Sequence, residues 1–245
     1  MQHNWFENWF DSPYYHLLYS HRNYSEAAHF ITNLFGHLNL PKGSKVLDLA
    51  CGKGRHALQI HNLGNDVIGL DLSPQSIDAA NAKAEKGLSF QTGDMRNLSF
   101  NSDFDLVVNL FTSFGYFKQE GDNVKVIKSI ARSLRKDGLL VLDYLNVSKV
   151  VSGLPTKETI VRKDISFDVS KTVIDGFIVK TIKFEDQEEN FEFREHVKLI
   201  SLVDFERIFE VCGFEVKATF GDYNLNRFEE NTSERLIFIA RKINE

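Results

Sequence analysis

The chain has 245 residues, of which 42% are hydrophobic and 26% charged, and its formal net charge at pH 7 is -5. Such a composition is typical of a globular protein that is one large domain or a domain with an insertion. The negative balance argues against a nucleic-acid partner, because nucleic-acid-binding surfaces are usually basic. Two cysteines cannot form a disulfide framework, and we expect no metal because no Cys/His cluster has zinc-ligand spacing. No run approaches a membrane span and no signal pattern opens the chain, so we expect a cytoplasmic protein.

Residues 1–40 are predicted to form an N-terminal helical lid. The aromatic-rich stretch 1–23 predicts short helices, and Ser25 is the expected N-cap of a longer amphipathic helix. Apolar residues recur in that helix at helical spacing, namely Ala27, Ala28, Phe30, Ile31, Leu34, Phe35 and Leu38. The turn "NLPKGSK" ends it.

Strands and helices then alternate from residue 46 to residue 144. The expected strands are 46–49, 67–71, 88–91, 104–109 and 139–144, and one of the helices between them covers 122–135 and ends before an Asp137-Gly138 turn. Two further strands, "FEVKATF" and "RLIFIARK", complete the chain. The pattern predicts an α/β fold with a parallel sheet covered on both faces.

The helical pattern is interrupted after residue 146. Residues 158–200 alternate with period two, and Asp175-Gly176 is a strong hairpin signal. A helix follows from Ser201 to Gly213. We therefore assign 41–146 and 201–245 to the main domain and 147–200 to an inserted antiparallel β-subdomain. The insertion is expected to be a substrate cap or a dimer contact, and a homodimer is left open.

The loop "VLDLACGKGRHA" (46–57) is the main functional signal. Its Gly52-x-Gly54-x-x-Ala57 pattern fits a dinucleotide loop, which by itself is weak evidence. Asp48 disfavours a pyrophosphate there, because a carboxylate repels phosphate and suits a cationic ligand group. Alternatively, Asp48 only accepts N–H bonds from the loop.

Acidic residues also end the next two strands. Asp71 has the spacing from the glycine loop expected of a carboxylate that binds ribose hydroxyls. Asp94, in "TGDM", can accept from an exocyclic amine such as that of adenine, or it can cap the following turn.

The ordered motifs "VLDLACGKGRHA", "VIGLDLS", "TGDM", "FDLVVNLFTSFGYF" and "LLVLDYLN" resemble those of class I S-adenosylmethionine-dependent methyltransferases, and most of all a bacterial subgroup. The resemblance runs from about Tyr14 to the C-terminus, with Lys53 where the family more often has a small residue. It implies a Rossmann-like, doubly wound, mostly parallel sheet of seven strands with an antiparallel C-terminal hairpin, and S-adenosyl-L-methionine as cofactor. The cofactor-binding positions that it implies are Tyr19, Arg22, Asp48, Ala50, Gly52, Gly54, His56, Asp71, Leu72, Asp94, Met95 and Leu110. Among these, Arg22 is expected to bind the methionine carboxylate and Leu72 to pack on adenine.

The methyl acceptor is predicted to be a small molecule, since the lid would enclose the site, and both an enclosed site and an acidic chain favour a metabolite over a polymer. Tyr116, Asp143 and His196 are the candidate catalytic residues, with packing, capping or no special role as the alternatives. Transfer would occur by in-line displacement, for which correct placement alone supplies roughly 7–11 kcal/mol. The competing functions are a nicotinamide-dependent oxidoreductase, a non-catalytic S-adenosylmethionine-binding protein, and an RNA or protein methyltransferase.

Overall fold

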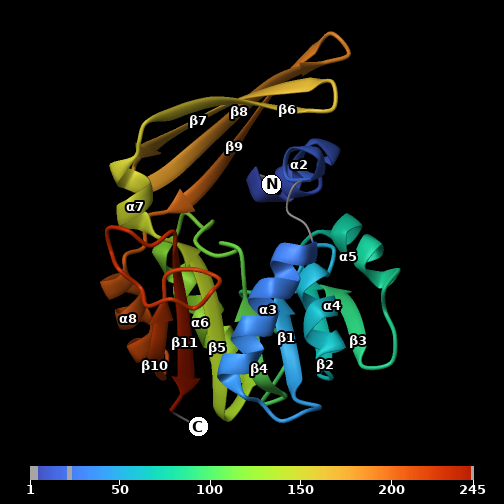
Figure 1. Cartoon of the computed structure of the whole chain (residues 1–245), viewed down its shortest axis with the longest axis vertical. Coiled ribbons are helices and arrows are strands. Elements are labelled where there is room, and N and C mark those ends of the chain that lie inside the picture. Colours follow the sequence, from blue (N-terminus) through green and yellow to red (C-terminus); the bar gives the residue numbers. More distant parts are fainter. Residues whose placement is uncertain (1–4, 21–23, 244–245) are drawn as a thin grey trace.

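The computed structural model describes residues 5–20 and 24–243, and its centre is a seven-stranded sheet (Figure 1). The strands are β1 (Lys45–Leu49), β2 (Asp66–Asp71), β3 (Leu88–Thr92), β4 (Phe104–Asn109), β5 (Leu134–Leu145), β10 (Phe214–Phe220) and β11 (Arg235–Lys242). Their order is β10-β11-β5-β4-β1-β2-β3. Strands β1 to β5 pair in parallel, and β11 is antiparallel to both of its neighbours. The predicted Rossmann-like sheet with an antiparallel C-terminal hairpin is thus confirmed.

Helices cover both faces of this sheet (Figure 1). One face packs against α3 (Tyr24–Leu38), α4 (Arg55–Asn62) and α5 (Pro74–Asn81). The other packs against α6 (Glu120–Ser133) and α8 (Leu202–Val211). Because β4 is covered on both sides, its last four residues are all buried, which explains the apolar run Leu106-Val107-Val108 within it. Within the described ranges no helix is long and apolar enough to cross a bilayer.

A second, four-stranded antiparallel sheet stands above the carboxyl edge of the first (Figure 1). After the short helix α7 (Val147–Ser152), it is built from β6 (Thr156–Arg162), β7 (Ile165–Ile174), β8 (Phe177–Asp186) and β9 (Glu189–Lys198) in that order. The predicted hairpin turn is present between β7 and β8, where Asp175 and Gly176 have φ of 48° and 76°. Two consecutive left-handed residues are what a tight two-residue hairpin requires.

Two short helices, α1 (Trp5–Phe10) and α2 (Pro13–Leu18), pack against the second sheet. The Trp9 ring is 1% exposed and lies 4.4 Å from the ring of Phe193 on β9. Its indole Nε1 donates to Glu195 Oε1 over 2.7 Å. The predicted short N-terminal helices therefore exist, and the inserted sheet supplies the apolar surface that holds them.

Two local predictions were wrong. Ser25 lies inside α3 rather than at its N-cap, because the helix already includes Tyr24. The helix predicted to run to residue 135 ends at Ser133, since Leu134 already pairs with Phe104 as the first residue of β5. Asp137, with φ of 60°, marks the predicted turn as an irregularity inside that strand.

Candidate active site

A cavity of about 970 Å³ lies at the carboxyl edge of the large sheet. It sits where strand order reverses between β1 and β4, the usual ligand position in open α/β sheets. Most predicted cofactor residues line it: Tyr19, Ala50, Gly52, His56, Asp71, Leu72, Asp94, Met95 and Leu110. Asp48 and Gly54 are buried and do not line the cavity, and Arg22 lies outside the described residues.

Both glycines of the glycine loop adopt the left-handed backbone conformation. Gly52 and Gly54 have φ of 54° and 75°, a backbone region that L side chains rarely adopt. A Cβ added at Gly54 would also lie 2.5 Å from the Phe90 ring, whereas one at Gly52 would meet nothing within 4 Å. Gly54 is therefore required by packing, and Gly52 leaves space for a ligand.

Asp48 is a buried carboxylate with only part of its hydrogen-bonding capacity used. It is 1% exposed and accepts from the backbone N–H of Ala57 in the first turn of α4. Its Oδ2 has no hydrogen-bond partner among the described residues. Burial raises the pKa of Asp48 to about 7, with Asp71 adding to the effect. The carboxylate thus stabilises the loop and still has an oxygen for a cationic group.

His56, which lines the cavity, provides a second buried polar atom without a partner within the described ranges. Its ring is 6% exposed, and its Nε2 has no partner in the part of the chain that the structure describes. Burial, with a contribution from the charge of Arg55, lowers the pKa of His56 to about 3, so the ring is neutral at pH 7. Buried polar atoms without partners are uncommon in native proteins, so Nε2 of His56 is available to a ligand in the cavity.

Asp71 ties the glycine loop to the start of α5. Its Oδ2 accepts from Gly52 N at 2.7 Å and its Oδ1 from Ser73 N at 2.9 Å. The Ser73 hydroxyl also donates to Asp11, so the α1–α2 connection reaches this edge. Burial raises the pKa of Asp71. Since a carboxylate offers about four acceptor positions, ribose binding stays a compatible prediction.

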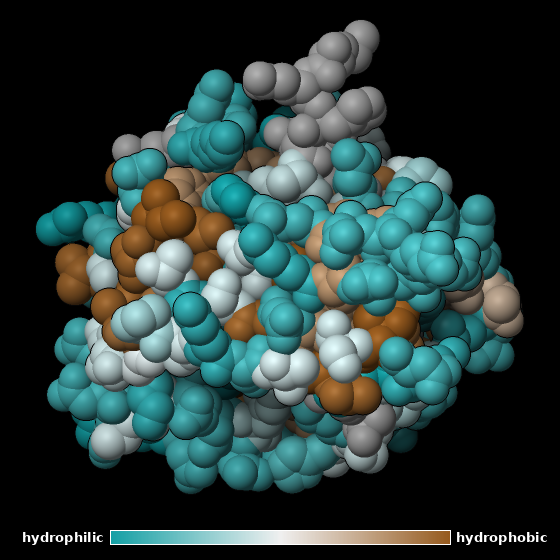
Figure 2. Space-filling model, turned by 90° about the horizontal axis from the view of Figure 1, so that it is seen from above, coloured by the Kyte–Doolittle hydropathy of each residue, from teal (hydrophilic) through white to brown (hydrophobic). Residues whose placement is uncertain are grey.

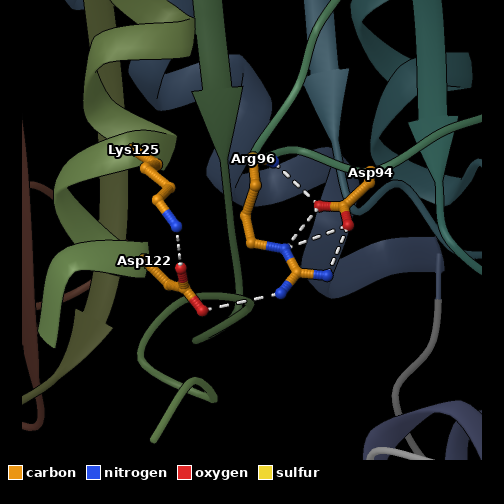
Figure 3. Close-up of polar contacts among 4 residues, drawn as sticks. All are labelled: Asp94, Arg96, Asp122 and Lys125. Atoms are coloured by element: carbon orange, nitrogen blue, oxygen red, sulfur yellow. Dashed lines mark hydrogen bonds and ion pairs between the residues drawn. The ribbon is translucent and has the colours of Figure 1, made fainter. Parts of the chain in front are cut away.

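Asp94 is already engaged in an ion pair (Figure 3). Arg96 donates to it through Nη2 at 2.6 Å and through Nε at 3.0 Å, and Arg96 Nη1 lies 3.6 Å from Asp122 Oδ2. Burial acts to raise the pKa of Asp94, but the hydrogen bonds and charge of Arg96 outweigh it and lower the pKa. An adenine amine at Asp94, which stays a prediction, would share the carboxylate with Arg96.

The loop after β4 contains two consecutive non-glycine residues in the left-handed region. Phe111 and Thr112 have φ of 64° and 61°, a conformation that costs about 1–3 kcal/mol each. Asp143 holds both: its Oδ2 accepts from Phe111 N at 2.8 Å, and its carbonyl accepts from Thr112 N at 3.0 Å. Arg235 binds Asp143 Oδ1 at 2.7 Å and donates to Thr112 Oγ1 at 2.9 Å.

Asp143 is 0% exposed and does not line the cavity. Tyr223 also donates to its Oδ2, at 3.1 Å, so that both carboxylate oxygens are occupied by groups of the protein itself. These contacts favour a role for Asp143 in positioning the loop after β4 over the predicted catalytic role.

The other two catalytic candidates stay predictions. Tyr116 lines the cavity, its hydroxyl donates to the Thr112 carbonyl, and its ring is 5.3 Å from that of Trp5. His196 does not line the cavity, but its ring lies 5.8 Å from Trp5. Burial lowers its pKa, as do Lys118 and Arg194.

The sequence did not lead us to predict several residues that line the cavity, among them His16, Lys171, Lys180 and Glu195. Glu195 was detectable, because it stands on the same face of β9 as Phe191, Phe193 and Val197, where a charge is out of place. His16 gives no such signal. Burial and the charge of Lys53 lower the pKa of His16.

The sheet has this strand order, its glycine loop is left-handed, and acidic residues lie in β1, at the end of β2 and just after β3. These features are those of a class I S-adenosylmethionine-dependent methyltransferase. Residues 46–138 match the family described as "Methyltransferase domain". The chain is 27% identical to the presumed methyltransferase YqeM of Bacillus subtilis over 93% of this chain and 94% of that protein.

Two further comparisons agree. A dTDP-3-amino-3,4,6-trideoxy-alpha-D-glucopyranose N,N-dimethyltransferase of Streptomyces venezuelae is 31% identical over 53% of this chain and 54% of its own length. The crystal structure of an S-adenosylmethionine-dependent methyltransferase from Clostridium acetobutylicum superposes with a TM-score of 0.78 at 21% identity, covering 93% of this chain and 95% of that one. The likeness confirms the fold.

The residues present fit S-adenosylmethionine, the methyl donor of the class. The unpartnered Oδ2 of Asp48, which is buried behind the cavity lining, and Nε2 of His56, which lines the cavity, are suited to a charged amino-acid group, and a Cβ at the cavity residue Gly52 would meet nothing within 4 Å. The volume of the cavity is at the upper end of the range for ligand pockets, about 300–1,000 Å³, so it has room for more than the cofactor.

Proposed function

We propose that the chain transfers a methyl group from S-adenosylmethionine to an amine nitrogen of a small molecule held in the same cavity. The observation that carries the proposal is the composition of the cavity wall. Residues of the cofactor edge, such as Gly52 and Asp71, line it together with Trp5 of α1 and Lys180 of the inserted sheet. The Streptomyces venezuelae relative, whose name specifies N,N-dimethylation of an amino sugar, supports an amine as acceptor.

The cofactor supplies an activated methyl group, and the chain supplies its binding groups. We propose that Asp48 and His56 bind the amino-acid end, with Ala50, Gly52 and Leu110 beside it. Asp71 would bind the ribose, while Leu72, Asp94 and Met95 would contact adenine. Tyr19 and Arg22 would close the site from the N-terminal side.

We propose that α1, α2 and residues 147–200 form the acceptor part of the site. Trp5, Phe10 and Tyr116 stand together there, with ring centroids 5.3–5.6 Å apart. Aromatic faces stabilise a neighbouring cation by about 0.5–2 kcal/mol. An amine acceptor must lose its proton, and Tyr116 and His16 are the titratable groups of this wall that we propose for the task.

A thermal-shift experiment tests the cofactor half of the proposal. A ligand that binds only the folded state at 100 times its Kd stabilises by about 2.7 kcal/mol, which corresponds to a rise of about 5–10 °C in the Tm of a chain of this size. S-adenosylhomocysteine should produce this shift and NADH should not. The reverse pattern would favour the oxidoreductase alternative.

We expect Asp71→Ala to lose the S-adenosylhomocysteine shift, since the carboxylate both organises the glycine loop and faces the cavity. Asp66→Ala, at the exposed opposite end of the same strand, is the matched control and should bind normally. Calorimetric titration provides the affinities. An Asp71→Ala protein with wild-type affinity would show that the ribose assignment is wrong.

A further inference from the structure

Lysines and arginines at the surface of the molecule need no ligand, because water and nearby carboxylates stabilise their charge. Seen from above, over the inserted sheet, the molecule is mainly hydrophilic, with smaller apolar patches (Figure 2). Lys183 on β8 is an example of such a surface cation: its side chain is 62% exposed and lies 3.1 Å from Glu192.

Lys242, near the end of β11, is in a different environment. It is 7% exposed, and within residues 5–20 and 24–243 it is the one lysine or arginine that is buried. Its Nζ donates to the Leu134 carbonyl over 2.8 Å and forms no ion pair with a described residue. An ammonium group has three N–H donors, so two of them have no hydrogen bond to the described residues. Burying such a charge is costly unless an anion compensates it.

The end of α6 compensates this charge only in part. Leu134 is the C-cap of α6, so one N–H of Lys242 caps the helix. The carbonyls of Arg132 and Ser133 already accept from backbone N–H groups of the loop before β4. A helix C-terminus is equivalent to roughly half a negative charge, whereas Lys242 and Arg132 in the last turn carry two positive charges.

Lys242 lines a pocket of about 290 Å³ at the amino edge of β4 and β5. Strand β11 ends at this edge, on the side of the large sheet that lies away from the inserted sheet (Figure 1). The pocket is therefore opposite to the large cavity. Its other lining residues are Asn101, Ser102, Ala131, Arg132, Cys212 and Gly213, none of which is acidic.

The other polar side chains of the pocket also have unused donors. Arg132 Nη2 donates to the Leu98 carbonyl at 2.6 Å and to Ser129 Oγ at 3.4 Å, and no carboxylate among the described residues pairs with it. The Asn101 amide and the Ser102 hydroxyl form no hydrogen bond with the described residues. Two cations, one amide and one hydroxyl thus line a pocket without a carboxylate.

We propose that this pocket binds a small phosphate, either inorganic phosphate or a compact phosphate monoester, through Lys242 and Arg132. Hydrogen bonds between ionised partners are the strong ones, and the several oxygens of a phosphate match four donor side chains better than the two oxygens of a carboxylate do. The pocket is slightly smaller than the range of about 300–1,000 Å³ for drug-sized ligands, which suits a small anion. The site is separate from the methyl-transfer cavity and goes beyond the proposed function.

Cys212 provides a readout that is specific to this pocket, because its thiol lines it and is partly exposed. Burial raises the pKa of Cys212, and the charge of Lys128 acts against this effect. A bound phosphate would shield the thiol and offset Lys128, so thiol labelling at Cys212 should slow by about threefold or more. Mass spectrometry of the labelled peptides separates Cys212 from Cys51, which lines the large cavity.

The full chain is titrated with inorganic phosphate, with glycerol phosphate, and with sodium chloride at matched ionic strength. We expect saturable protection of Cys212 by phosphate, by the monoester or by both, and none by chloride. The Tm should rise by about 3–6 °C at ten times the Kd of the active anion. The active probe identifies free phosphate or a phosphate ester as the recognised form.

Lys242→Met should weaken phosphate binding by about tenfold or more, and Arg132→Met should weaken it in the same direction. Arg135→Met is the matched control, since Arg135 lies in β5 near the same edge, is 45% exposed, pairs with Asp105 at 2.7 Å and does not line the pocket. Lys242→Arg keeps the charge and should retain binding if Lys242→Met folds poorly.

Cys212 labelling that neither phosphate nor the monoester slows would overturn the proposal. Equal affinities of the wild type, Arg132→Met and Lys242→Met would also overturn it. In either case Lys242 would serve only as a cap of α6.

Discussion

Asp143→Ala should lower the free energy of unfolding by about 3–5 kcal/mol, the usual cost of removing one partner of a buried ion pair. The Arg235 guanidinium would lose its carboxylate while its side chain is only 19% exposed. Phe111 and Thr112, both left-handed, would lose the side chain that accepts from Phe111 N. Urea unfolding measures the change. Glu215→Ala, which removes an ion pair with exposed partners, is the control and should change stability little.

Asp143→Asn separates a positioning role from a catalytic one. If Asp143 positions the loop, this variant should lose stability and S-adenosylhomocysteine affinity together, because Phe111 and Thr112 line the cavity. The pH profile of its remaining methyl transfer should match that of the wild type. A variant with normal stability and normal affinity that fails to transfer methyl groups would instead support the proton-transfer role predicted from the sequence.

Asp48→Asn should make the ligand-free protein more stable at about pH 8 while weakening its binding of S-adenosylhomocysteine. Burial raises the pKa of Asp48 to about 7 from its ordinary value of 3.8. Between these two values the folded state binds the proton more tightly than the unfolded state does, so this group's stabilising contribution falls as pH rises. Above about pH 7 the ionised carboxylate costs on the order of a few kcal/mol, and asparagine removes that cost while its amide oxygen still accepts from Ala57. Thermal unfolding at about pH 5 and about pH 8 should show the gain only at the higher pH.

Ligand binding should depend on pH in the opposite direction. The ionised Asp48 favours the ammonium group of S-adenosylhomocysteine, so wild-type affinity should rise between about pH 6 and pH 8, and Asp48→Asn should lack this rise. Adenosine has no amino-acid group and is the control ligand, with an affinity independent of pH in both proteins. Identical pH profiles of the two proteins for S-adenosylhomocysteine would contradict the role of Asp48.

The sequence predicted those parts of the site that depend on local patterns. The predicted strand 104–109 agrees with β4 at both ends, because the strand is buried on both faces and the apolar run Leu106-Val107-Val108 stands out in the sequence. Asp71 and Gly52 could be singled out as cavity residues because they lie near strand ends with fixed spacing along the chain. The Asp94–Arg96 pair was within reach too, since only one residue separates the two in sequence.

The remaining parts depend on tertiary pairing. Asp143 and Arg235 are 92 positions apart, and their contact follows from the pairing of β5 with β11, which no local pattern shows. Lys171 and Lys180 face the cavity only because of the register between β7 and β8. In an antiparallel sheet, a shift by one residue would have turned both lysines to solvent.

The helices α1 and α2 pack on the inserted sheet. The cavity residues of the glycine loop and of the ends of β2 and β3 belong instead to the Rossmann-like sheet. Under the proposed assignment, changes in the inserted strands would leave the residues that bind the nucleoside in place. Evolution could thus adapt this scaffold to new metabolites by altering one half of the molecule. Laboratory recombination of residues 147–200 between relatives offers a direct route to exchange acceptor preference.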